Sequence, residues 1–115
     1  MKLTLNRREE QKKGMFSSST VYCLDVYLEA TPEEIATIKK YQWDNMPFCE
    51  STFLAGRPIE FTVGDVVGQP KQWGFKTIEE LAHAESQVIE NAKNLKQQLE
   101  VVAGFTSGGP REIEL

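Results

Sequence analysis

The sequence predicts an α+β protein in which a mostly antiparallel sheet packs in two layers with one short and one long helix. Three observations predict this fold. Alternating apolar and polar residues mark short strands, two segments that open with Thr carry helix-start signals, and an apolar stripe runs through the last third of the chain. The expected order of elements is ββαβββαβ, within a single domain over residues 1–115.

The strands at the start of the chain are predicted from their alternation. Leu3 and Leu5 alternate with polar neighbours, which indicates a short first strand. Residues 21–30 give the clearest strand. One face is expected to be core and carries Tyr22, Leu24, Val26, Leu28 and Ala30, while the other carries Cys23, Asp25, Tyr27 and Glu29. Residues 11–20 are polar and contain several Ser and a Gly, so we expect a mobile loop there.

A short helix is expected next. Thr31 is a suitable N-cap, and Glu34 completes a capping box with it. The helix should end before Pro47, because proline and the preceding turn-forming residues oppose its continuation. Two further strands are then expected near 51–54 and 59–63.

The long helix has clear signals at both ends. Thr77 and Glu80 form a second capping box, and Gly104 is a natural C-terminal cap, so the helix should occupy the residues between them. Residues 105–110 form a Gly- and Pro-rich turn, and the alternating segment 112–115 is expected to be an edge strand or a tail.

An apolar stripe in heptad phase runs along this helix, with Glu85 as its one polar member. Its residues are Ile78, Leu81, Glu85, Val88, Ala92, Leu95, Leu99 and Val102. The opposite face is expected to be solvated and includes Glu79, Glu90, Lys93, Asn94 and Gln97.

The length of this helix favours a homodimer. It should span roughly 37 Å, whereas a compact domain of this size is roughly 35 Å across. One end should therefore extend past the sheet and expose part of the stripe, which a second copy could cover. Antiparallel pairing near Glu90 would place Glu85 beside Leu95 and Lys96 of the other copy, so the predicted interface is the whole stripe together with Lys96. The alternative is a monomer in which Glu85 points to solvent.

Composition argues against several functional classes. The chain is 40% apolar and 26% charged, as is typical of soluble globular proteins. Its net charge of -4 arises in the second half, which argues against binding to a phosphate backbone. No signal-peptide or membrane-spanning pattern is present, and the two cysteines suggest free thiols, so a cytoplasmic location is expected. No metal or cofactor motif is present, and none is predicted to bind.

One alternative function is an RNA or single-stranded nucleic-acid binder that uses Trp73, Phe75 and basic residues. Residues 71–78, KQWGFKTI, partly resemble the ribonucleoprotein octamer of RNA-recognition motifs, with Trp73 and Phe75 at aromatic positions. Gln72, Lys76 and Ile78 depart from that pattern. The resemblance implies that Trp73 and Phe75 would be exposed to stack on bases. Together with Tyr27 and Asp25, they form the candidate ligand surface.

A small enzyme with a site near Cys23 and Asp25 is the other alternative, and it would gain support if His83 lay beside them. No established catalytic motif is present in the sequence. The sequence therefore favours a non-catalytic protein-interaction or adaptor module that forms a homodimer through its long amphipathic helix and binds a further protein.

Overall fold

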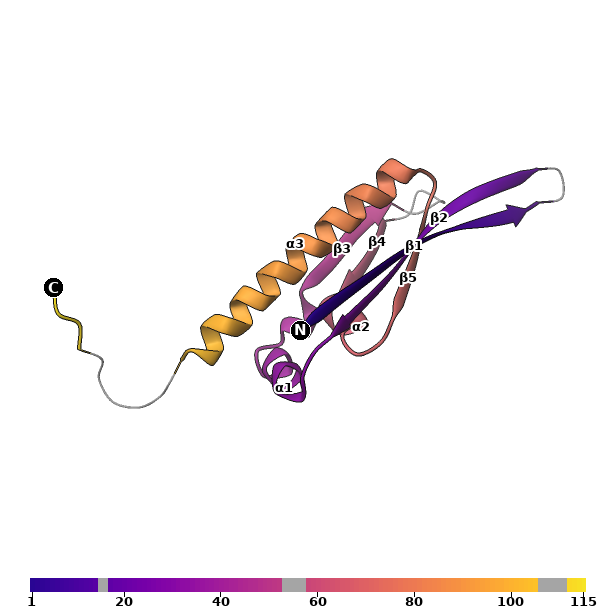
Figure 1. The fold of residues 1–115 in the computed structure, drawn as a ribbon. Helices are drawn as coiled ribbons and strands as arrows, with labels where there is room; N and C mark the ends of the chain where they lie inside the picture. The colour runs from indigo at the N-terminus through magenta and orange to yellow at the C-terminus, as the bar shows by residue number, and fades with distance from the viewer. Residues whose placement is uncertain (15–16, 53–57, 106–111) are drawn as a thin grey trace.

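The fold consists of two antiparallel sheets and a long helix around one core (Figure 1). This computed structural model describes residues 1–14, 17–52, 58–105 and 112–115. The predicted α+β class is confirmed, and the strands are antiparallel as expected. They form a three-stranded sheet in the order β1-β2-β5 and a separate pair, β3-β4.

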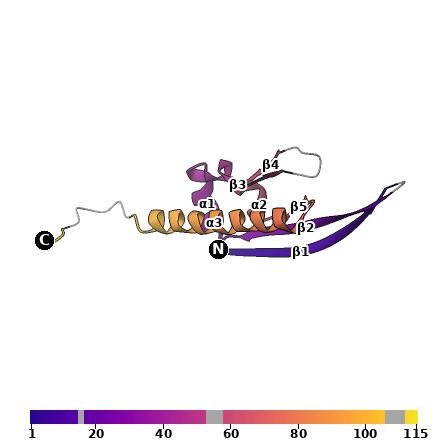
Figure 2. The same cartoon turned by 90° about the horizontal axis from the view of Figure 1, so that it is seen from above.

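The first two strands form a long hairpin. β1 (Lys2–Lys13) pairs with β2 (Ser18–Glu29) in continuous register from Lys2↔Glu29 to Lys13↔Ser18. The predictions of a short first strand and of a loop over 11–20 were therefore wrong. Figures 1 and 2 show the hairpin extending beyond the other elements. Its outer part needs no apolar alternation, because main-chain pairing forms it without a core to cover.

The predicted core face of β2 is confirmed for Leu24, Val26 and Leu28, which are all fully buried. The expectation for the other face was wrong at Cys23, which is also buried. Arg8 lies opposite Cys23 in β1 and bonds across the same face to Asp25, with 3.0 Å between Nε and Oδ2. The Cys23 thiol thus lies beside an ion pair.

A capped helix and a turn follow the hairpin. α1 (Pro32–Lys40) begins with the predicted capping box, in which the Glu34 N–H donates to Thr31 Oγ1 and the Thr31 N–H donates to Glu34 Oε1. Gln42 has a left-handed backbone (φ 59°), which reverses the chain after α1 and leads into the 3₁₀ turn η1 (Trp43–Asn45).

The middle of the chain supplies the second sheet. β3 (Pro47–Thr52) begins earlier than predicted and pairs with β4 (Pro58–Thr62). The turn predicted near 55–58 lies largely outside the described residues. α2 (Val63–Val66) was not predicted, and a capping box between Thr62 and Asp65 starts it. β5 (Lys71–Phe75) then joins the first sheet beside β2.

The long helix confirms its predicted boundaries. α3 (Ile78–Ala103) has Thr77 as N-cap, with Oγ1 accepting from the Glu80 N–H at 3.1 Å, and Gly104 as C-cap. In Figure 2, β1 and β2 lie on one side of α3 and β3 and β4 on the other. Its C-terminal turns extend past the strands in both views, as the length predicted. Residues 112–115 form no strand, contrary to one expectation.

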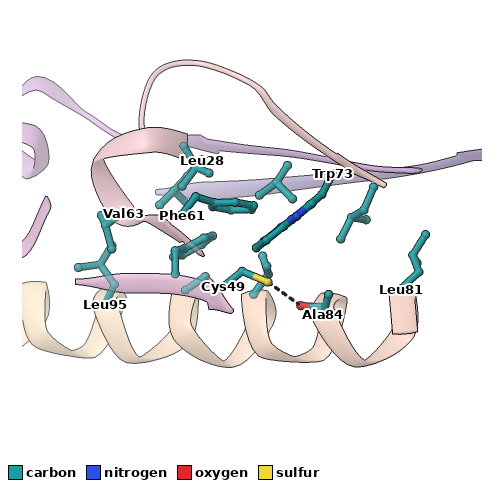
Figure 3. Close-up of a cluster of buried hydrophobic side chains, with 14 of the residues drawn as sticks. Leu28, Cys49, Phe61, Val63, Trp73, Leu81, Ala84 and Leu95 are labelled. Atoms are coloured by element: carbon teal, nitrogen blue, oxygen red, sulfur yellow. Dashed lines mark hydrogen bonds between the residues drawn. The ribbon is translucent and has the colours of Figure 1, made fainter. Parts of the chain in front are cut away.

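The core lies between α3 and the strands (Figure 3). Phe61 of β4 packs against Trp73 of β5, with ring centroids 4.0 Å apart. Leu81, Ala84 and Leu95 face these side chains from α3. Both sheets and α3 therefore contribute side chains to one core.

Candidate functional site

Most of the predicted dimer interface lies in the core of the same chain. The buried members of the stripe are Leu81, Val88, Ala92, Leu95 and Leu99. A second copy cannot pack on these residues without displacing the chain's own strands. The interface predicted over the whole stripe is therefore corrected, because intramolecular packing already covers its centre. Ile78 is 53% exposed and Lys96 is also exposed, while Val102 is half-buried.

Glu85 has a cation partner within the chain. Arg7 of β1 donates two hydrogen bonds to its carboxylate, from Nε at 2.9 Å and from Nη2 at 2.6 Å. These bonds and the charge of Arg7 lower the pKa of Glu85, although partial burial opposes the shift. The ion pair links the first strand to α3. Lys96 of another copy is therefore not needed to explain a carboxylate in the apolar stripe.

Trp73 and Phe75 cannot stack on nucleic-acid bases, because they are only 3% and 0% exposed. The exposure that the nucleic-acid alternative required of these two residues is therefore absent. Trp73 pairs with Leu24 and shares its face of the sheet, whereas Asp25 and Tyr27 lie on the other face. The four residues of the predicted ligand surface do not form a common surface.

The residues of the enzyme alternative also lie apart. Asp25 bonds to Arg8 on the face of the sheet away from α3, whereas His83 is exposed on α3. His83 Nε2 lies 2.8 Å from Gln87 Nε2, and His83 does not line the cavity to which Cys23 contributes. Among the described residues, no three His, Cys, Asp or Glu side chains are grouped so that they could hold a metal ion.

A row of amide side chains on α3 is the feature that the sequence interpretation missed. Its members are spaced by four, three and four residues and so lie on one side of the helix: Gln87, Asn91, Asn94 and Gln98. We refer to these four residues as the amide row. The spacing is visible in the sequence, but Asn94 was expected to belong to a solvated face, because amides carry no apolar signal.

The first two members of the amide row bind the edge of β3. Gln87 Oε1 accepts from the Glu50 N–H at 3.2 Å, and Asn91 Nδ2 donates to the Phe48 carbonyl at 3.0 Å. These main-chain groups point away from β4, so the amides occupy the place of a neighbouring strand. The helix therefore binds extended main chain through side-chain amides.

A groove continues along the same side of α3. It consists of two adjoining cavities of about 470 Å³ and 510 Å³, which share Asn94 and Gln98. Met46, Pro47 and Leu95 contribute to the first cavity. The second cavity is lined by Trp43, Asn94, Gln97, Gln98, Val101 and Val102. We call the two cavities together the α3 groove.

Exposed apolar side chains lie at the end of this groove. Val101 is 74% exposed in the last turns of α3, and Phe105, which directly follows the C-cap Gly104, is 75% exposed. Trp43 and Val101 both line the second cavity, and Trp43 stacks on Tyr41, with ring centroids 5.2 Å apart. Lys40 Nζ lies 5.4 Å from the centroid of the Tyr41 ring. An aromatic and basic rim thus borders an apolar surface.

Cys49 lies in the wall of the first cavity, with its Sγ atom 3.8 Å from Gln87 Oε1 and 4.0 Å from the Ala84 carbonyl oxygen (Figure 3). Burial, together with the charge of Glu50, raises the pKa of this thiol to about 12. Cys49 therefore remains protonated near neutral pH and supplies no thiolate nucleophile. The chemistry of the groove is hydrogen bonding and apolar contact.

The chain matches no protein-family model, no curated protein and no solved structure. None of the helices in the described segments combines the length and apolar composition needed to cross a membrane.

Proposed function

We propose that this protein is a protein-interaction module that acts by binding rather than catalysis, and that it forms a homodimer through the C-terminal part of α3. The observation that carries the proposal is the exposure of Val101 in the last turns of α3 and of Phe105 directly after its C-cap. Large apolar side chains that lie together on a surface favour a protein partner.

A second copy is the partner that this surface supports best. Two helix ends packed about a twofold axis would each bring the same apolar residues to the contact, so one surface serves both chains. The buried part of the stripe ends at Leu99, and the contact would begin where that core ends. This arrangement retains dimerisation through the long helix but transfers the contact to Val101 and Phe105.

The expected affinity is modest. Burying a Val or Phe side chain contributes about 1.5–3 kcal/mol, so two such residues from each chain contribute about 6–12 kcal/mol. Association costs about 4–15 kcal/mol in lost translational and rotational freedom. The most favourable difference, about 8 kcal/mol, corresponds to a Kd of about 1 μM, so the dimer should be no tighter than micromolar.

Light scattering on a sizing column tests the proposal. The wild-type chain should be a dimer at tens of micromolar and should dissociate on dilution, whereas Val101→Asp should be a folded monomer at both concentrations. Ser86→Asp is the matched control, since Ser86 is exposed on the same helix beside the sheet and the variant adds the same charge. A monomeric wild-type chain would refute dimerisation. A Val101→Asp dimer would show that the contact lies elsewhere.

A further inference from the structure

We infer that the α3 groove binds an extended segment through Asn94 and Gln98, and that this segment is Glu112–Leu115 of a second copy. The inference rests on the proposed homodimer and adds an exchange of C-terminal segments between the two chains. The segment has the sequence Glu-Ile-Glu-Leu, in which apolar and acidic residues alternate.

The contacts of Gln87 and Asn91 show how such a segment would be held. These two amides serve main-chain groups of residues two apart in β3, Glu50 and Phe48. Four helical residues rise about 6 Å, and two extended residues rise about 6.7 Å, so the two spacings nearly match. Asn94 and Gln98 are also four residues apart. They can therefore serve a second extended segment in the same way.

Asn94 and Gln98 are available for this contact. Both side chains are exposed, and neither forms a hydrogen bond with another residue that the structure describes. They line both cavities of the α3 groove, of which the first is still lined by residues of β3 and the second is not. An incoming segment would thus continue along α3 in the position that β3 holds beside Gln87 and Asn91.

Side-chain character fits the same occupant. Ile113 is 66% exposed and Leu115 is fully exposed, and their alternation places both on one side of an extended segment. The second cavity offers Trp43 and Val101 to such side chains. The intervening Glu114 would lie toward the rim, where Lys40 sits against the Tyr41 ring that stacks on Trp43. The groove would therefore offer apolar contacts to Ile113 and Leu115 and a positive charge to Glu114.

A second copy, rather than the same chain, is the occupant that the structure favours. Residues 112–115 lie away from the groove in both views, and their side chains are exposed (Figures 1 and 2). The helix ends that carry Val101 would meet in the proposed dimer, so each segment would leave its own helix beside the groove of the other. Two equivalent contacts would then close the dimer.

Disulfide trapping between two full-length variants tests the inference. Gln98→Cys in one chain and Ile113→Cys in the other should form a covalent heterodimer on mild oxidation of the mixture. The native thiols of Cys23 and Cys49 are buried and should not compete. Glu79→Cys replaces Gln98→Cys as the control, because Glu79 is exposed at the far end of α3, and it should give no heterodimer.

Other outcomes separate the two proposals. A chain carrying both Gln98→Cys and Ile113→Cys that cross-links only within itself would assign the groove to its own segment and overturn the exchange. A wild-type dimer without trapping would overturn the exchange and leave the proposed dimer in place. As a second measurement, Ile113→Asp should raise the dimer Kd about tenfold or more, because one apolar side chain per groove is lost. An unchanged Kd would contradict the inference.

Discussion

Substitutions of Leu95 distinguish whether the heptad stripe of α3 belongs to the core or to an interface. Its side chain is 1% exposed and faces the core from α3. Replacement by Ala should cost about 2–5 kcal/mol, from lost transfer free energy and the cavity that remains. Replacement by Glu also buries a carboxyl group without a partner, which adds about 1–3 kcal/mol or more.

The stability of the whole domain determines how much of this free-energy cost the fold can tolerate. At about 0.05–0.15 kcal/mol per residue, a chain of 115 residues has roughly 6–17 kcal/mol. Leu95→Ala should therefore remain folded with a lower urea midpoint, and Leu95→Glu, at about 3–8 kcal/mol, should lower the midpoint further and remove about half of the stability. Gln97→Glu is the control, because that side chain is exposed two positions away and its change should stay within about 0.5 kcal/mol.

Urea titration followed by circular dichroism measures these differences, and light scattering follows the oligomeric state. The core assignment predicts that Leu95→Glu unfolds at a lower urea midpoint than Leu95→Ala. If Leu95→Glu instead unfolds cooperatively at the wild-type midpoint and differs only in being monomeric, the stripe is an interface and the packing described for α3 is wrong.

Two further predictions concern the N-cap of α3 and the ion pair that joins α3 to β1. Thr77→Ala should lower stability by about 1 kcal/mol in urea, because the Glu80 N–H loses its cap, while Thr77→Ser should retain most of it; equal midpoints for all three chains would contradict the cap. Glu85→Gln should lower the melting temperature at neutral pH, and the difference should vanish as the pH falls through the depressed pKa of Glu85, because a lowered folded-state pKa stabilises only above that range. Arg7→Gln should show the same pH dependence, and a difference that persists in acid would assign the effect to packing.

The sequence by itself determined the elements that depend on near neighbours. Thr31 and Glu34 form the predicted capping box, and Thr77 caps the Glu80 N–H as predicted, although the Glu80 carboxylate accepts from the Lys76 N–H and so does not complete the second box. The core face of β2 at Leu24 also followed from alternation, because side chains on a strand alternate strictly between two faces. These signals act within a few residues, so they survive in almost any tertiary context.

Much of the candidate site depended on contacts that the local pattern does not specify. The amide row was visible as a spacing on α3, but its role required the edge of β3, and Asn91 lies 43 residues from Phe48. Trp43 reaches the same groove because Gln42 reverses the chain after α1. No periodicity in the sequence places these segments side by side.

Only the tertiary structure decided what covers the apolar stripe. The pattern around Leu95 shows that one face of α3 avoids water, and this is equally true of a core and of an interface. Likewise, the position of Glu85 in an apolar stripe predicted that a cation would pair with it. That cation is Arg7, which is 78 residues away in the sequence. Hydrophobic burial is non-directional and specifies no partner, so the partner is determined by the chain's topology and by which of its surfaces can close around one core.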